Sequence, residues 1–155
     1  MSFRVLGLDP DQFSHLHGLS DADLAAAGAK RYVVDATPGY PDRVAVRDLD
    51  VGDRAILLNY EHQPAHTPYR SRHAIFVREG ASRALDVTDV IPDAVRIRPI
   101  SLRAFSDNGE MVDANLVNGD ALVPLIERFF NNPTVAYLHA HYAKRGCYAA
   151  RIVHA

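Results

Sequence analysis

The sequence predicts an α+β fold, in which a mostly antiparallel sheet or a partly closed barrel packs against two helices and ends in a terminal β-hairpin. Three observations lead to this prediction. Short apolar stretches separated by turn signals recur from residue 31 onward, two segments have helical spacing, and the last twenty residues have the pattern of a hairpin. A doubly wound parallel sheet would need a helix between successive strands, and the sequence has too few.

The size and composition indicate one domain spanning residues 1–155. The chain has no internal repeat and no linker rich in Gly, Ser or Pro, and its 48% hydrophobic and 23% charged residues are typical of globular proteins. The N-terminal stretch lacks a signal-peptide core, and no run is long enough to span a membrane. Because the single cysteine, Cys147, has no internal partner, we expect a cytoplasmic protein without a membrane partner.

The first half of the chain is expected to begin with a strand at residues 3–8 and a short helix at residues 20–28. Ser20 is a preferred residue at a helix N-terminus, and Gly28 is a preferred residue just after a helix end. Proline and glycine turn signals then separate three short stretches of strand-forming residues, at 31–36, 43–46 and 54–60.

The second half adds a main helix and more strands. Residues 61–73, rich in His and Pro, predict a long loop, and Ser106–Gly109 predicts a hairpin turn because Asn and Gly tolerate positive φ. Apolar residues at helical spacing predict a helix at 120–130. The expected strands cover residues 74–78, 95–105, 110–117, 134–142 and 147–153, the last two forming the terminal hairpin around the turn 143–146.

Five short motifs resemble a bacterial family known as domain of unknown function 1203. They are Pro38–Arg43, Gly52–His62, Thr67–Arg70, Ala74–Val77 and Gly146–Arg151. The resemblance spans about residues 30 to 155. It implies no activity, because the family has none established.

The expected loop at residues 60–73 is the first candidate site. It contains Glu61, His62, Tyr69, Arg70 and Arg72, which could supply a general base and a guanidinium clamp for a carboxylate or phosphate. The wider segment from residue 70 to residue 103 has seven arginines against four acids. A small anionic ligand is therefore the leading hypothesis, and the alternative is a solvated surface loop without a ligand.

The second candidate site is a histidine pair. His139 and His141 lie two residues apart on an expected strand, so both imidazoles should be on one face. Zinc or iron would need a third ligand, for which Cys147, Glu61 and His62 are the available donors. The alternative is that both histidines are half exposed on the polar face of an edge hairpin.

Three functions therefore stay open: an anion-binding domain, a metal-assisted enzyme and a protein interaction module. The sequence does not decide whether the chain is an enzyme, and it requires no cofactor, although a divalent metal would suit the histidine pair. A net charge of −2 argues against a nucleic-acid partner, because such binding needs a concentrated positive surface. A homodimer through the exposed part of a helix or strand edge is left open.

Overall fold

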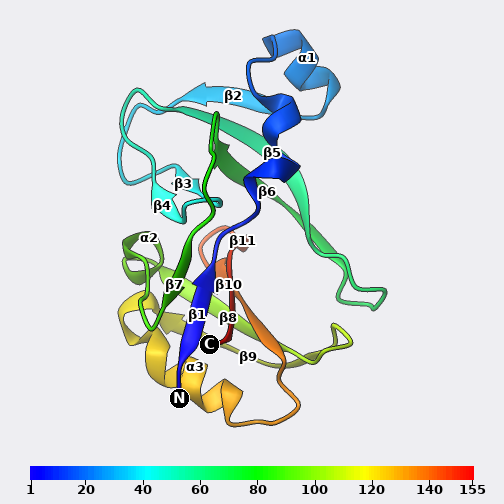
Figure 1. Ribbon diagram of the computed structural model, residues 1–155, viewed down its shortest axis with the longest axis vertical. Helices are drawn as coiled ribbons and strands as arrows, with labels where there is room; N and C mark the ends of the chain where they lie inside the picture. The colour runs from blue at the N-terminus through cyan, green and yellow to red at the C-terminus, as the bar shows by residue number, and fades with distance from the viewer.

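The chain folds into two sheets with α1 and α3 at opposite ends, as the computed structural model of residues 1–155 shows (Figure 1). The six-stranded sheet has the order β7 (Asp86–Thr88), β1 (Phe3–Leu6), β11 (Cys147–His154), β10 (Tyr137–Tyr142), β8 (Pro99–Phe105) and β9 (Met111–Asn118). The five-stranded sheet has the order β2 (Lys30–Val33), β5 (Arg54–Gln63), β6 (Ser71–Arg78), β3 (Pro41–Asp42) and β4 (Arg47–Asp48).

The predicted α+β class and the terminal hairpin of β10 and β11 are confirmed. All strand pairs are antiparallel except the short pairing of β3 with β6, and neither sheet closes into a barrel. The structure has three α-helices rather than two, α1 (Asp21–Ala26), α2 (Asp93–Arg96) and α3 (Leu122–Phe130), because a single turn that buries Ala94 and Val95 precedes β8. None of these helices has the length and apolar composition needed to cross a membrane.

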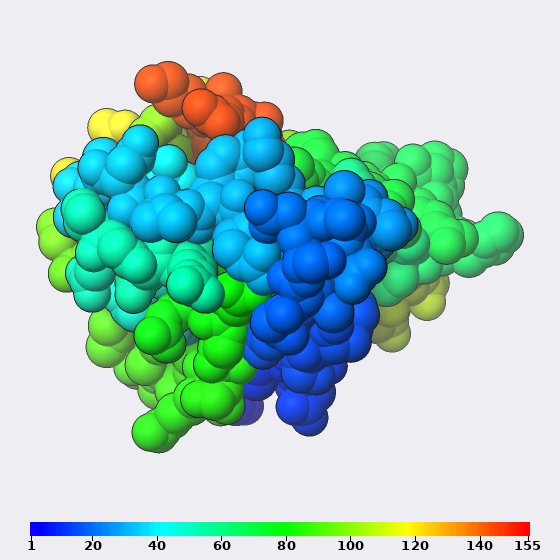
Figure 2. Space-filling model, turned by 90° about the horizontal axis from the view of Figure 1, so that it is seen from above, coloured from blue at the N-terminus to red at the C-terminus, as the bar shows by residue number.

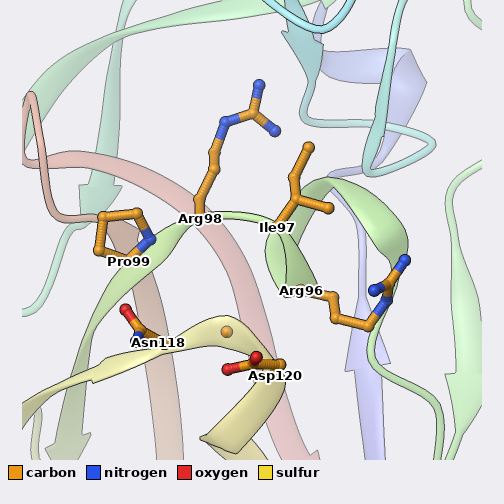
Figure 3. A pocket seen from close by; sticks show the side chains of 7 residues that line it. Arg96, Ile97, Arg98, Pro99, Asn118 and Asp120 are labelled. Atoms are coloured by element: carbon orange, nitrogen blue, oxygen red, sulfur yellow. The ribbon is translucent and has the colours of Figure 1, made fainter.

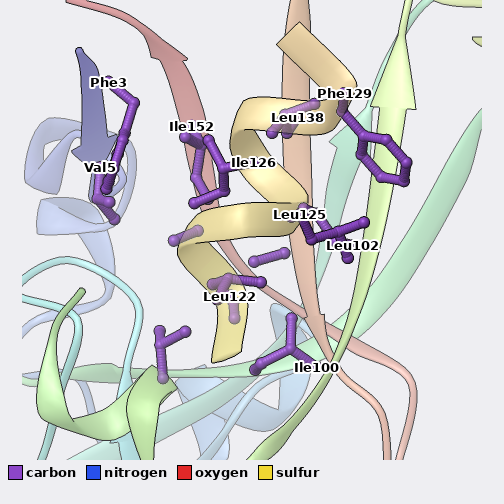
Figure 4. Packing of buried hydrophobic residues seen from close by; sticks show 14 of the residues in the cluster. Phe3, Val5, Ile100, Leu102, Leu122, Leu125, Ile126, Phe129, Leu138 and Ile152 are labelled. Atoms are coloured by element: carbon purple, nitrogen blue, oxygen red, sulfur yellow. The ribbon is translucent and has the colours of Figure 1, made fainter. Parts of the chain in front are cut away.

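Helix α3 covers one face of the six-stranded sheet and forms the larger core with it (Figure 4). Leu122, Leu125, Ile126, Phe129 and Phe130 are all buried, as their helical spacing predicts. They pack against side chains of β8, β10 and β11, among them Ile100, Leu102, Leu138, Ala140 and Ile152. This face of the sheet is therefore covered by apolar side chains, and any polar site of this sheet must lie on the opposite face.

The five-stranded sheet has a smaller core of its own. Ile56 on β5 and Ile75 and Val77 on β6 are fully buried against the N-terminal segment, which contributes Phe13, Leu16 and Leu24. The N-terminal segment forms 3-10 turns at residues 10–12 and 14–16 before α1, which Ser20 caps by accepting a hydrogen bond from the Asp23 N–H.

The predicted strand at residues 43–46 is wrong, because these residues form a turn between β3 and β4. The buried carboxylate of Asp42 accepts hydrogen bonds from the backbone N–H groups of Val44 and Ala45, at 3.1 and 2.8 Å. It also accepts one from the N–H of Arg78 on β6. A side chain that satisfies backbone donors in this way favours a turn over a ladder.

The predicted loop at residues 61–73 is shorter than expected. Strand β5 continues to Gln63 and β6 begins at Ser71, so only residues 64–70 connect them. The pairing continues because a β-bulge between Tyr60 and Gln63 shifts the register and lets the ladder resume. In Figure 2 the connection projects from one side of the molecule, in the green of this part of the chain.

A buried arginine joins the two sheets. Arg43, 2% exposed, donates to the backbone carbonyl of Tyr148 on β11 at 2.8 Å and to that of Pro41 at 2.5 Å. Its guanidinium also lies 3.1 Å from the Cys147 sulfur and 5.0 Å from the centre of the Tyr142 ring. Burial lowers the pKa of Arg43, but an arginine remains charged in proteins, so these partners must replace its water.

We expect Arg43→Ala to lower the free energy of unfolding by about 3 kcal/mol or more, because it leaves a buried carbonyl without a donor and creates a cavity. The matched control is Arg54→Ala on the exposed side of β5, which should change stability by less than about 0.5 kcal/mol. Urea unfolding followed by circular dichroism measures both. Equal midpoints for the two variants would contradict the anchoring role of Arg43.

Candidate metal site

Three histidines from the two sheets meet where the sheets face each other. His62 is on β5, His73 on β6 and His141 on β10, and one ring nitrogen of each lies within 4.8 Å of the others. His62 and His141 are buried, whereas His73 is partly exposed. The cluster is thus closed on most sides and accessible past His73.

The strands of the five-stranded sheet bring His62 and His73 to the facing surface by alternation. On β6, His73 shares parity with Ile75 and Val77, so it continues the inward face of the strand beyond the apolar core. On β5 the bulge after Tyr60 turns both His62 and Gln63 inward, and both are buried. A bulge that re-aims side chains is a frequent feature beside functional sites.

The six-stranded sheet supplies His141 from the face opposite α3. Leu138 and Ala140 belong to the core under α3, so His139 and His141 point the other way, toward the five-stranded sheet. The pairing of β10 with β11 also shifts by one residue between Ala140 and His141. The prediction that the two histidines share a face is confirmed, but the face is buried between sheets and is not an exposed hairpin surface.

The hydrogen-bond pattern prepares these imidazoles to act as ligands. His141 Nδ1 lies 2.8 Å from the carbonyl oxygen of Gly146, which can only accept, so Nδ1 carries the proton and Nε2 is left with its lone pair. Gly146 has a φ of 79°, which permits the turn that directs this carbonyl at His141. Among these three imidazoles, the buried nitrogens without any partner are His141 Nε2, both nitrogens of His62 and His73 Nδ1.

The surroundings keep the histidines neutral. Burial, together with the charge of neighbouring imidazoles and guanidinium groups, lowers the pKa of His62 to about 4, of His139 to about 3 and of His141 to about 2. No carboxylate contributes to any of these shifts. Neutral imidazole is the form that binds a metal ion.

Aromatic rings hold the imidazoles in place. The Tyr148 ring of β11 stacks on His62 with centroids 5.4 Å apart and an interplanar angle of 11°. Tyr148 pairs with His141 across the hairpin, and its backbone carbonyl accepts a hydrogen bond from Arg43. The anchor between the sheets therefore also fixes the ring against which His62 packs.

His139, predicted as a ligand, lies beside the cluster. Its ring centroid is 6.0 Å from that of His62 and 6.4 Å from that of His141, and its Nδ1 is buried without a partner. It packs against Phe105 and Tyr137. The member of the cluster that the sequence analysis missed is His73, whose parity with Ile75 and Val77 would have indicated it once β6 was extended to residue 71.

The polar residues predicted to bind an anion lie on the other face of β5 and β6. Glu61 accepts hydrogen bonds from Arg70 at 2.7 Å and from Arg72 at 2.9 Å, and these guanidinium groups hold the pKa of Glu61 below its usual value. Tyr69 is exposed in the connection between the strands. Of the predicted set, only His62 reaches the histidine cluster, and Glu61 and Cys147 lie outside it.

A surface pocket of about 240 Å³ lies elsewhere, at the start of β8 and the end of β9 (Figure 3). Its two arginines have partners, because Arg96 pairs with Asp93 and Arg98 pairs with Asp48. None of the histidines lines it. The pocket therefore lacks the buried, unpartnered nitrogens that distinguish the histidine cluster.

Most of the length of the chain matches one known protein family. Residues 39–154 match the family described as protein of unknown function (DUF1203). The chain belongs to this family. The matched range contains His62, His73, His139 and His141, so the whole cluster lies within the DUF1203 region. No curated protein and no solved structure was found to match the chain.

We expect the stability of the metal-free DUF1203 chain to fall as the pH is lowered from 7 to 5. The buried histidines of the folded chain stay neutral to about pH 4 or below, while those of the unfolded chain take up protons around pH 6.5. Each contributes a slope of up to about 1.4 kcal/mol per pH unit, and the loss ends below the folded-state pKa values.

Urea unfolding in the presence of a chelator at pH 7, 6 and 5 measures this dependence. The charged groups that act on these three histidines are guanidinium groups that stay protonated throughout, so the change in stability comes from proton uptake by the same histidines in the unfolded chain. His139→Gln should reduce the slope by removing one of them. A flat profile between pH 7 and 5 would contradict the burial of neutral imidazoles.

Proposed function

We propose that the protein binds one divalent transition-metal ion through His62, His73 and His141 and acts as a metal-assisted enzyme. The main support for this proposal is that three imidazoles from two sheets converge. Each of them has a buried nitrogen without a hydrogen-bond partner. This revises the ligand set expected from sequence, with His73 in place of His139.

The unpartnered nitrogens are the energetic argument. A buried polar atom without a hydrogen bond costs about 1–3 kcal/mol, so native proteins keep few of them. Here the two buried histidines and His73 leave four such atoms in one place. An ion that accepts one lone pair from each imidazole would offset most of this cost, leaving one nitrogen of His62, whereas a purely structural cluster of histidines would leave all of it.

The donor set favours a first-row transition metal. Imidazole suits zinc, copper, iron and nickel, and the lack of carboxylates argues against magnesium or calcium. Two nitrogens bound to one zinc ion lie about 3.4 Å apart, given bonds of about 2.0–2.1 Å at tetrahedral angles. The nitrogens of the cluster lie within 4.8 Å of one another, so small rotations of the imidazole rings would complete the arrangement.

Three protein ligands support catalysis more than structure. Structural zinc sites are closed by four protein ligands, whereas catalytic sites have three and leave a position for water or substrate. Three neutral imidazoles would also leave the full positive charge of the ion, which would supply a water of lowered pKa as a nucleophile. The partial exposure of His73 leaves a route from solvent to this position.

The alternative of an anion site at Arg70 and Arg72 has less support. Both guanidinium groups are engaged by Glu61, and each side chain is 56% exposed. An external anion would have to compete with Glu61 in water, where single ion pairs are weak. The histidine cluster, which is buried and has no internal partner, is the stronger candidate.

We expect about one metal ion per chain in protein purified without a histidine tag and incubated with zinc. His73→Ala should lose the ion, because it removes one of three ligands. His66→Ala is the matched control, since His66 is exposed in the connection 64–70 and should leave the metal content unchanged. Elemental analysis after gel filtration measures the metal content of each protein.

A further variant separates the two possible ligand sets. His139→Gln should retain the ion if His62, His73 and His141 are the ligands, and should lose it if His139 is one. Thermal unfolding of each variant shows whether it is folded. A metal-free wild type, or equal retention by His73→Ala and His66→Ala, would overturn the proposed site.

A further inference from the structure

Beside the histidine cluster lies an arginine without an acidic partner. Arg103 on β8 pairs directly with His139 on β10, so its side chain is on the same face of the six-stranded sheet as the histidines. It is half-buried, and no carboxylate lies within 4.0 Å of its guanidinium group. Its one hydrogen bond within the protein is a long one of 3.4 Å, from Nε to the Ser101 hydroxyl.

The other arginines of similar burial show that this is unusual for the molecule. Arg31 forms an ion pair with Glu79 at 2.6 Å, and Arg98 forms one with Asp48 at 2.7 Å. Their side chains are 16% and 20% exposed. A partly desolvated guanidinium group normally finds such a partner, because its five donors lose water on burial. Apart from the long contact with Ser101, the donors of Arg103 have no hydrogen-bond partner within the chain.

The charge of Arg103 acts on the cluster. It lowers the pKa of His62, His139 and His141, whereas no acidic side chain raises any of them. A second arginine, Arg151 on β11, pairs with His139 from the other side and also has no ion pair. Its guanidinium lies over the Tyr137 ring, 4.1 Å from the centroid. The facing surface is therefore positive even before a metal ion binds.

We propose that the molecule that this centre binds is a small oxyanion, a carboxylate or phosphate, held between the histidine cluster and the Arg103 guanidinium. This inference rests on the proposed metal site, because the ion would supply the second positive group. Arginine donors form paired hydrogen bonds with the oxygens of both anions, which lysine cannot match. A cationic or purely apolar molecule would leave Arg103 desolvated and unpaired.

Ligand binding to the cobalt-loaded protein tests this inference, because the visible spectrum of cobalt reports a change in its ligands. Inorganic phosphate and acetate are the two probes. Both the wild type and Arg103→Gln should take up about one cobalt ion per chain, since Arg103 is not a ligand and its removal takes away a positive charge near the ion. Arg103→Gln should then bind the anions at least about tenfold more weakly, because it loses charge-assisted hydrogen bonds.

Two further variants complete the design. Arg128→Gln, on the exposed side of α3 across the six-stranded sheet, removes the same charge elsewhere and should bind the anions as the wild type does. Arg103→Lys should recover part of the affinity by restoring the charge without the paired donors.

The outcomes separate this inference from the metal site. Wild-type protein that takes up no cobalt overturns both. Cobalt-loaded wild type whose spectrum is unchanged by phosphate and acetate, or Arg103→Gln that binds them with wild-type affinity, overturns the anion assignment and leaves the metal site standing. A preference for phosphate over acetate, or the reverse, identifies which oxyanion the site takes.

Discussion

A buried guanidinium group joins the two sheets, together with the contacts Gln63–Tyr137 and Asp48–Arg98. The side chain of Arg43 extends from the turn after β3 into the interior, where it donates a hydrogen bond to the Tyr148 carbonyl on β11. This bond connects the smaller sheet to the larger one. Burying a charge is costly unless its donors are satisfied, which fixes the distance between the turn and β11 within narrow limits. The same Tyr148 stacks on His62, and the anchoring contact thereby sets the position of an imidazole.

Strand alternation and one β-bulge together account for the convergence of the histidines. Alternation along β6 and β10 points His73 and His141 into the space between the sheets, whereas on β5 the bulge after Tyr60 turns His62 there as well. Apolar packing from α3 and the N-terminal segment does not reach this space. The site therefore lies between two cores and is built from residues that neither core needs.

The sequence predicted the parts of this arrangement that depend on local patterns. Helix α3, the turn at Ser106–Gly109 and the terminal hairpin were evident from spacing and turn residues, and the shared face of His139 and His141 followed from strand alternation. The position of His73 beside His62 and His141 was missed because prolines in residues 61–73 indicated a loop. In the structure, cross-strand pairing makes β6 begin as early as residue 71. Convergence of β5, β6 and β10 is a tertiary property that no local pattern contains.

The separation of the histidines along the chain has a kinetic consequence. His62 and His73 come from the middle of the sequence and His141 from near its end, so the cluster exists only after the two sheets have docked. Contacts of such long range form slowly. An ion that binds only the completed cluster stabilises an interaction absent from earlier states, which slows unfolding and leaves the rate of folding nearly unchanged. Metal loading would thus govern the lifetime of the folded chain, and with it the resistance of the chain to proteolysis when cleavage outpaces reclosing.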